Sequence, residues 1–387
     1  MEKKKNDFIA QGSILAIASI LVRVMGMIYR IPMTAIIGDK GNGFYSYAYS
    51  VYTILLLLSS YSLPLAVSKM VSAKAQLGQW RNVKRVFICA IAFAIGIGTT
   101  FGLIVLIGAQ FFTRVFFHSE LAAIALRFMA PTILIMALLG VFRGFFQGLQ
   151  NTLPTAVSQI VEGLINAIMS VVFAYFLFDF GHGMDAAGGT TDLGYAWGAA
   201  GGAIGTGAGA LAGLIFCFIL FVAYRKILAV NISRDKTGTQ QEYGDIFRLM
   251  LSIALPVILS TALYNLIELV DGSLFNNIMA SKGMEDVKDS MWGAYNAKAL
   301  LLVHIPVSIS SAMAVSLVPT LTAAYALGDE QTAKSKVHAI LRFISILAFP
   351  SAVGLLVLAN PIIKTLFSGD TSAASTYLQV VCPAVIT

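Results

Sequence analysis

Residues 8–37, "FIAQGSILAIASILVRVMGMIYRIPMTAII", are apolar throughout except for a few uncharged polar residues and two arginines, Arg23 and Arg30. A run of about 20 apolar residues is long enough for an α-helix to cross a bilayer whose hydrocarbon core is roughly 30 Å thick. An arginine at the bilayer centre costs at least about 2.5–3.5 kcal/mol, so it usually faces a bundle interior or a wet cavity. The stretch therefore predicts a membrane helix that carries two charges in need of polar surroundings.

The rest of the chain repeats this pattern. Of its 387 residues, 58% are hydrophobic and 12% are charged, whereas roughly a quarter are charged in a soluble domain. The prediction is an all-α polytopic membrane protein with nine full spans and the start of a tenth. We place the spans at residues 8–37, 43–72, 84–112, 121–148, 152–179, 199–224, 246–280, 295–325, 337–358 and 373 onward.

The basic residues fall on alternate sides of these spans. Lysines and arginines are frequent at residues 3–5, 69–85, 225–248 and 334–342, whereas the opposite side holds few, among them Lys40 and Arg114. Because basic loops stay in the cytoplasm, the pattern predicts a multi-pass membrane protein with a cytoplasmic N-terminus. The net charge of +7 is spread between spans, so no nucleic-acid partner is expected.

A shift of the sequence by 250 residues aligns it with itself. The shift places Gly43 and Tyr45 over Gly293 and Tyr295, and it predicts two parallel six-helix repeats. The expected domains are an N-terminal lobe at 1–228, a cytoplasmic linker at 229–245 and a C-terminal lobe at 246–387. The chain stops inside the apolar segment "TYLQVVCPAVIT", which predicts a truncated second lobe. The cavity between two such lobes is where a transporter would bind its substrate.

Four basic residues are candidates for the wall of this cavity. Arg23 and Arg30 lie seven residues apart and share one helical face, and Arg143 and Lys298 add positive charge from other spans. Bland alternatives stay open for each of them. Arg30 can extend to the interface, Arg23 can form a structural ion pair, and Arg143 can anchor a helix end. Lys298 can pair with an acidic residue of span 7, and His304 is a conditional charge beside it.

Acidic and amide residues within the spans are candidates for countercharges or ion coupling. Glu162 either hydrogen-bonds a neighbouring helix or holds an arginine in place or exchanges protons. Asn265, Glu268 and Asp271 follow one another at spacings of three in span 7 and share one helical face. Oxygen ligands suit a hard cation, so Glu268 and Asp271 are candidates for a Na⁺ or H⁺ site. Alternatively, Asp271 is solvated at the outer end of its helix.

Enzyme signatures are absent from the sequence. There is no phosphate-binding loop of the G-x-x-x-x-G-K-[ST] kind, no H-E-x-x-H and no nucleophile elbow. The three cysteines lie in apolar runs without ligand spacing, and the glycine-rich residues 188–213 favour close helix packing over nucleotide binding. We therefore expect no enzyme, no certain metal site and no cofactor apart from a coupling ion.

Three stretches resemble a known family: "RVMGMIYRIPMTAIIGDKGNGFYSYAYSVY" (23–52), "LPLAVSKMVS" (63–72) and "FRGFFQGLQNTLPTAVSQIVE" (142–162). Together they resemble bacterial polysaccharide biosynthesis proteins of the stage V sporulation protein B type. These belong to the multidrug/oligosaccharidyl-lipid/polysaccharide exporter superfamily, which includes lipid II flippases. The resemblance covers essentially the whole chain. It implies about fourteen spans, two six-helix lobes and two extra helices, of which this chain has the first part.

The resemblance also carries individual residues over. Arg23, within an R-x-x-G context that ends at Gly26, is similar to the first-helix arginine that lipid II flippases have in their cavity. Their second arginine falls where this chain has Tyr29, and Arg30 comes one position later, about 100° around the helix. Span 2 has no basic residue before Lys69, although those relatives have an arginine there. Some members place a Na⁺ ligand on helix 7, which Glu268 or Asp271 could match.

The implied activity is a flippase that moves an undecaprenyl diphosphate-linked oligosaccharide or peptidoglycan precursor to the outer leaflet by alternating access. Its partners would be that lipid-linked precursor and the membrane lipids, in cell-wall synthesis or sporulation, while the sequence leaves the oligomeric state open. Two alternatives remain: a cation-coupled multidrug exporter of the same superfamily, and a non-transporting membrane partner of a cell-wall synthase. The coupling ion, Na⁺ or H⁺, also stays open.

Overall fold

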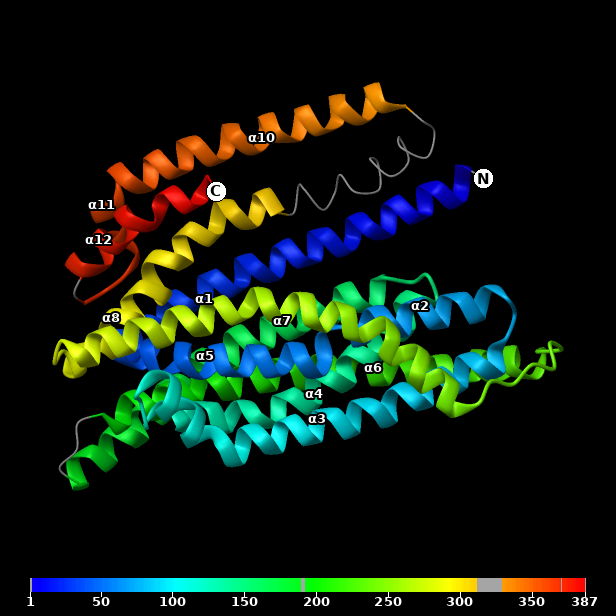
Figure 1. Ribbon diagram of the computed structural model, residues 1–387, viewed down its shortest axis with the longest axis horizontal. Helices are drawn as coiled ribbons and strands as arrows, with labels where there is room; N and C mark the ends of the chain where they lie inside the picture. Colours follow the sequence, from blue (N-terminus) through cyan, green and yellow to red (C-terminus); the bar gives the residue numbers. More distant parts are fainter. Residues whose placement is uncertain (1, 189–191, 312–328, 370, 387) are drawn as a thin grey trace.

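The computed structural model describes residues 2–188, 192–311, 329–369 and 371–386, and every element in these ranges is a helix (Figure 1). This agrees with the predicted all-α class. The elements are α1 (Glu2–Leu56), the π-helical η1 (Leu57–Tyr61), α2 (Leu63–Gln76), α3 (Trp80–Phe117), α4 (Ala122–Gly148), α5 (Leu153–Gly188), α6 (Leu193–Ser233), α7 (Tyr243–Ser281), α8 (Glu285–Ala294), the π-helical η2 (Tyr295–Leu300), α10 (Glu330–Val357), α11 (Ala359–Leu366), α12 (Ser372–Val381) and the 3₁₀ turn η3 (Cys382–Val385).

Predicted spans 1 and 2 form one continuous element with a sharp bend. Gly38 has φ 63° and ψ −176°, which is not helical and favours glycine. Past this bend the chain runs back toward the side of the molecule where it began (Figure 1). Two antiparallel crossings therefore lie within Ala18–Gln76, which is the first of seven candidate membrane spans in the described part of the chain.

The other predicted spans agree with the helices to different degrees. The predictions for spans 3 to 7 and span 9 coincide with α3 to α7 and α10, although the helices extend further at most ends. Predicted span 8 starts ten residues too late, because α8 begins at Glu285, and its later part falls on residues 312–328, outside the described residues. Predicted span 10 appears as the ten-residue α12. Such a helix is about 15 Å long and is too short by itself to cross a bilayer. The truncation of the second lobe and the domain limits stay predictions.

The helices α5 and α6 pack closely through a row of glycines. Gly201, Gly205 and Gly209 recur every four residues on one face of α6, which brings the α5 backbone into contact with α6. A Cβ built on Gly209 would lie 2.6 Å from the carbonyl oxygen of Glu162, and one on Gly205 would overlap Ser170. The glycine-rich stretch therefore serves helix packing, as the sequence indicates.

Substitution of Gly205 by alanine should destabilise the protein by about 1–3 kcal/mol, because a methyl group there overlaps Ser170 and forces the two backbones apart. Thermal unfolding of the purified protein in detergent measures the effect. Gly96→Ala on α3 is the matched control, since nothing lies within 4 Å of a Cβ at that glycine, and this change should be neutral or slightly stabilising. Equal unfolding temperatures for Gly205→Ala and Gly96→Ala would contradict the packing role.

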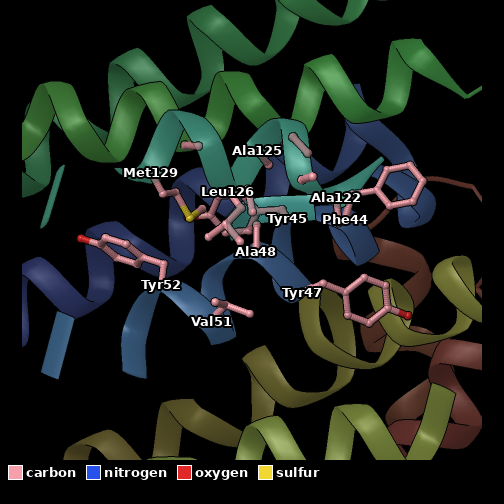
Figure 2. Close-up of a cluster of buried hydrophobic side chains, with 14 of the residues drawn as sticks. Phe44, Tyr45, Tyr47, Ala48, Val51, Tyr52, Ala122, Ala125, Leu126 and Met129 are labelled. Atoms are coloured by element: carbon pink, nitrogen blue, oxygen red, sulfur yellow. The ribbon is translucent and has the colours of Figure 1, made fainter. Parts of the chain in front are cut away.

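A buried aromatic and alanine cluster joins the second half of α1 to α4. Figure 2 shows Tyr45, Ala48 and Tyr52 facing Leu126 and Met129 across this interface. The hydroxyl of Tyr47, which belongs to the same cluster, donates to Asn276 Oδ1 of α7 at 3.0 Å, and both residues are fully buried. This bond ties α7 to the first half of the chain.

The C-terminal helices form a second hydrophobic cluster on the other side of α1. Leu302, Ala352 and Leu378 are among its buried members, and Met27 and Ile31 of α1 pack against it. On its other face α1 contributes Tyr29 and Met33 to the cluster shared with α4. The first helix therefore lies between two bodies of helices (Figure 1), and this position makes its polar residues candidates for an internal site.

Candidate functional site

A cavity of about 340 Å³ lies along α1 between these two bodies. It falls in the usual size range of ligand pockets. Its walls come from both halves of α1, from α5 and from the helical segment that follows η2. The lining residues are Val22, Arg23, Gly26, Met27, Tyr29, Arg30, Tyr49, Gly163, Asn166, Leu301, His304 and Ser308.

Both arginines of the first helix face this cavity. The side chain of Arg30 is half-buried, and its electrostatic neighbours are the phenols of Tyr29, Tyr45 and Tyr49. Arg23, seven residues earlier on the same helical face, is exposed. Seven residues correspond to nearly two turns, so both guanidinium groups line one wall. The register shift of Arg30 that the resemblance indicates therefore leaves this residue within the same cavity.

The cavity has a cationic character. Among the described residues its lining contains two arginines and a histidine but no carboxylate. None of the ion pairs within 4.0 Å among the described side chains involves Arg23 or Arg30. The Glu268 carboxylate is nevertheless an electrostatic neighbour of Arg30. Guanidinium groups that form no close ion pair attract an anion, and arginine binds phosphate in a bidentate geometry. The site can therefore hold an anionic group between the two bodies of helices.

Two residues of this wall were not predicted as ligands. Asn166 of α5 and Tyr49 of α1 offer hydrogen-bonding groups to the cavity. The sequence carries a weak signal for Asn166, which lies one helical turn after Glu162 on the same face of a membrane helix. Tyr49 gives no such signal, because a tyrosine among apolar residues is equally typical of a packed core.

Arg143, predicted as a cavity residue, instead forms an ion pair away from this cavity. Its guanidinium lies 2.7 Å from Oε2 of Glu162 and donates to Ser158 Oγ at 2.8 Å. The Arg143 side chain is 11% exposed and that of Glu162 is 24% exposed. The pair joins α4 to α5, and partial burial strengthens it relative to a surface pair. Glu162 is thus a countercharge that holds an arginine in place.

Lys298 also differs from its predicted place. It is 1% exposed, and its Nζ lies 2.8 Å from the carboxylate of Asp39, at the bend of α1. It therefore neither lines the cavity nor pairs with Glu268 or Asp271. The reason is the position of η2, which packs against α1 and brings Lys298 to its bend.

The contact around this pair has a reciprocal form. A Cβ on Gly43 would overlap the carbonyl of Asp289, and a Cβ on Gly293 would overlap the carbonyl of Asp39. Under the predicted shift of 250, Gly43 is the counterpart of Gly293 and Asp39 is the counterpart of Asp289. The two contacts are therefore equivalent under that shift, as expected for a repeat. The two segments cross at the distance that only glycine permits, and they close the space between the bodies at this end.

The polar residues of span 7 lie close to α1 without forming a closed cluster. Glu268 Oε1 accepts a hydrogen bond from Ser50 Oγ at 3.4 Å, and the Asn265 amide donates to its own helix at Thr261. Asp271 is exposed. Among the described residues no group of three histidine, cysteine, aspartate or glutamate side chains could hold a metal ion. A two-carboxylate Na⁺ or H⁺ site at Glu268 and Asp271 stays a prediction.

Comparison with known proteins gives two kinds of match. The polysaccharide biosynthesis protein family matches residues 8–324, and a second family of the same description matches residues 286–374. The lipid II flippase MurJ of Bacillus subtilis is 26% identical over 93% of this chain and 65% of its own length. The stage V sporulation protein B of the same organism is 24% identical over 98% of this chain and 70% of its own length. The chain thus spans about two thirds of these relatives.

Solved structures share the fold. An inward-facing multidrug resistance MATE family transporter of the MOP superfamily superposes with a TM-score of 0.70 at 13% identity, over 94% of this chain and 79% of the transporter. A MOP superfamily transporter from Pyrococcus furiosus gives 0.61 at 14% identity, over 97% and 78% of the two chains. The architecture is therefore MATE-like. The chain belongs to the polysaccharide biosynthesis protein family, whose model matches most of its length.

Proposed function

We propose that the protein is a flippase that moves an undecaprenyl diphosphate-linked oligosaccharide or peptidoglycan precursor from the cytoplasmic to the outer leaflet. The observation that carries the proposal is the cavity between the two bodies of helices, whose described lining includes Arg23, Arg30 and His304 but no carboxylate. A relative named as a lipid II flippase, which shares 26% identity, supports the same substrate class.

The chemistry of such a substrate fits the cavity walls. A diphosphate cannot cross hydrocarbon unaided, because an unpaired charge in the bilayer centre costs several kcal/mol. Guanidinium groups compensate that charge and form paired hydrogen bonds with phosphate oxygens. Tyrosine and asparagine side chains at Tyr49 and Asn166 add donors for sugar hydroxyl groups. The polyprenyl chain stays in the bilayer while the head group passes between the lobes.

The direction of transport rests on the orientation of the bundle. The positive-inside pattern supports a cytoplasmic end at the basic loops, so the crossing of Gly43 with Asp289 would close the outer end. Single cysteines at exposed positions such as Met284 and Lys226, in a background without the native cysteines, measure this. Impermeant maleimide should label Met284→Cys from outside the cell and Lys226→Cys only after lysis. The reverse pattern would invert the proposed direction.

The decisive experiment is reconstitution of the protein in liposomes with fluorescent undecaprenyl diphosphate sugar. We expect movement of the fluorescent lipid from the inner to the outer leaflet at a rate well above that in protein-free vesicles, measured by dithionite quenching. The same lipid without its diphosphate should not be moved, since the cavity would lack an anion to bind. Equal transport of the two lipids would contradict the proposal.

Two further outcomes identify the alternatives. A cation-coupled multidrug exporter would move cationic dyes and leave the diphosphate lipid in place. Transport of cationic dyes would disagree with the positive charge of the cavity lining. A membrane partner of a cell-wall synthase would move neither substrate. In that case substitutions in the cavity would be harmless in cells.

A further inference from the structure

A second cavity, of about 270 Å³, lies at the beginning of α3, remote from the interlobe cavity. One helical face of α3 supplies Arg81, Lys84, Arg85 and Ile88, which follow one another at spacings of three, one and three. Residues at these spacings point in the same direction. The end of α6 and the segment between α6 and α7 complete the walls.

In the described part of the chain, the lining of this pocket carries three cations and no carboxylate. The carboxylate next to it, Asp235, is occupied: it accepts hydrogen bonds from the backbone N–H of Arg81 at 2.9 Å and from the backbone and hydroxyl of Thr237 at 2.9 and 2.6 Å. These bonds lower the pKa of Asp235 to about 2. The acidic side chain therefore fixes the backbone around the pocket, while the side chains of Arg81 and Lys84 remain exposed to a ligand.

One wall of the pocket is fixed by Arg85. Its guanidinium donates to the carbonyl oxygen of Gln241 at 2.5 Å and to Oε1 of Gln240 at 2.8 Å. The same group lies over the ring of Tyr243, 5.2 Å from its centroid. A guanidinium group at this distance over an aromatic ring makes a favourable cation–π contact. The linker and the start of α7 are thereby held against α3.

The residues that begin α3 and α7 are of types that gather at a membrane interface. Trp80 begins α3 and Tyr243 begins α7, and both residue types gather at membrane–water boundaries. Below the cations the surface becomes apolar: Ile88 is 42% exposed, and the exposed side chains of Ile95 and Phe247 continue it along α3 and α7. An occupant that fits this surface has an anionic head and a hydrocarbon tail.

We propose that this pocket binds the head group of an anionic phospholipid, with its phosphate on Arg81 and Lys84 and an acyl chain along Ile88. Basic pockets between membrane helices recognise such head groups, and each Lys or Arg near the surface contributes measurably to binding. The site is distinct from the interlobe cavity and does not depend on which substrate that cavity carries. A bound lipid would join α3, the linker and α7, and so fix the junction between the two parts of the chain.

The test uses the full chain in detergent and compares phosphatidylglycerol with phosphatidylcholine by native mass spectrometry and thermal unfolding. We expect phosphatidylglycerol to bind in preference and to raise the unfolding temperature. The double variant Arg81→Gln with Lys84→Gln should bind it about 30-fold more weakly and lose the thermal shift. Arg85 is left intact because it holds the linker. The matched control, Arg225→Gln with Lys226→Gln, removes two exposed cations of α6 outside the pocket and should behave as the wild type.

Three results would overturn the proposal. Equal affinity for the two phospholipids in the wild type would remove the anionic specificity. An equal thermal shift with inorganic pyrophosphate alone would make the pocket a site for free phosphates. Displacement of phosphatidylglycerol by undecaprenyl phosphate at much lower concentration, again dependent on Arg81 and Lys84, would make it an entry site for the transported lipid.

Discussion

Replacement of both cavity arginines, Arg23→Gln with Arg30→Gln, is expected to reduce transport of an undecaprenyl diphosphate sugar by at least about 100-fold. Each guanidinium lines the same cavity, and a hydrogen bond to a charged group contributes about 1.5–3 kcal/mol. Loss of two such partners leaves the diphosphate without compensation in a low-dielectric site. The initial rate of lipid exchange in liposomes measures the effect, with the amount of inserted protein determined in parallel.

Two matched variants separate charge from geometry. Arg23→Lys with Arg30→Lys keeps both charges but loses the bidentate geometry, so its rate should lie between those of the wild type and the glutamine variant. Arg225→Gln, at an exposed position on α6, should transport at the wild-type rate. A glutamine double variant that inserts and transports normally would eliminate the cationic-cavity account.

Lys298→Met is expected to lower the free energy of unfolding by about 3–5 kcal/mol, because it leaves the carboxylate of Asp39 without its lysine partner in a buried contact. The lysine is 1% exposed and the Asp39 side chain is 18% exposed, so water replaces the lost partner only in part. Thermal or denaturant unfolding of the purified protein in detergent measures the loss.

A double-mutant cycle tests whether the pair itself is responsible. Lys298→Met combined with Asp39→Asn removes both charges, and it should be more stable than Lys298→Met alone, since the carboxylate that loses its lysine partner is also removed. Lys334→Met is the control, because the Lys334–Glu330 pair is exposed on both sides and should contribute less than about 1 kcal/mol. Additive losses in the double variant would show that Asp39 and Lys298 act independently.

The Lys298–Asp39 pair also bears on the proposed transport cycle. It lies beside the crossing of Gly43 and Gly293 with the carbonyls of Asp289 and Asp39. Alternating access requires the two bodies to separate at each end in turn. The close crossing therefore describes a state in which this end is closed, and opening there would expose the ion pair to water.

The sequence alone determined the features that depend on local periodicity and composition. Long apolar runs can cross a bilayer only as helices, because their backbone groups must be satisfied internally, and the helical period placed Arg23 and Arg30 on one face. The glycine-rich composition of residues 188–213 indicated close helix packing. The boundary between predicted spans 1 and 2 fell at the bend at Gly38. The start of α8 was missed, because this helix begins with charged residues that hydropathy does not assign to a span.

Only the tertiary structure decided which partner each charge meets. Lys298 pairs with Asp39, which is 259 residues away in the sequence, and Arg143 pairs with Glu162 across the boundary of α4 and α5. Spacing within one helix fixes the direction of a side chain, but the partner depends on how helices from distant parts of the chain pack. Spacing within one helix was therefore enough to predict a cationic cavity. Asn166 and Tyr49 became part of its wall only when tertiary packing placed α1 and α5 together.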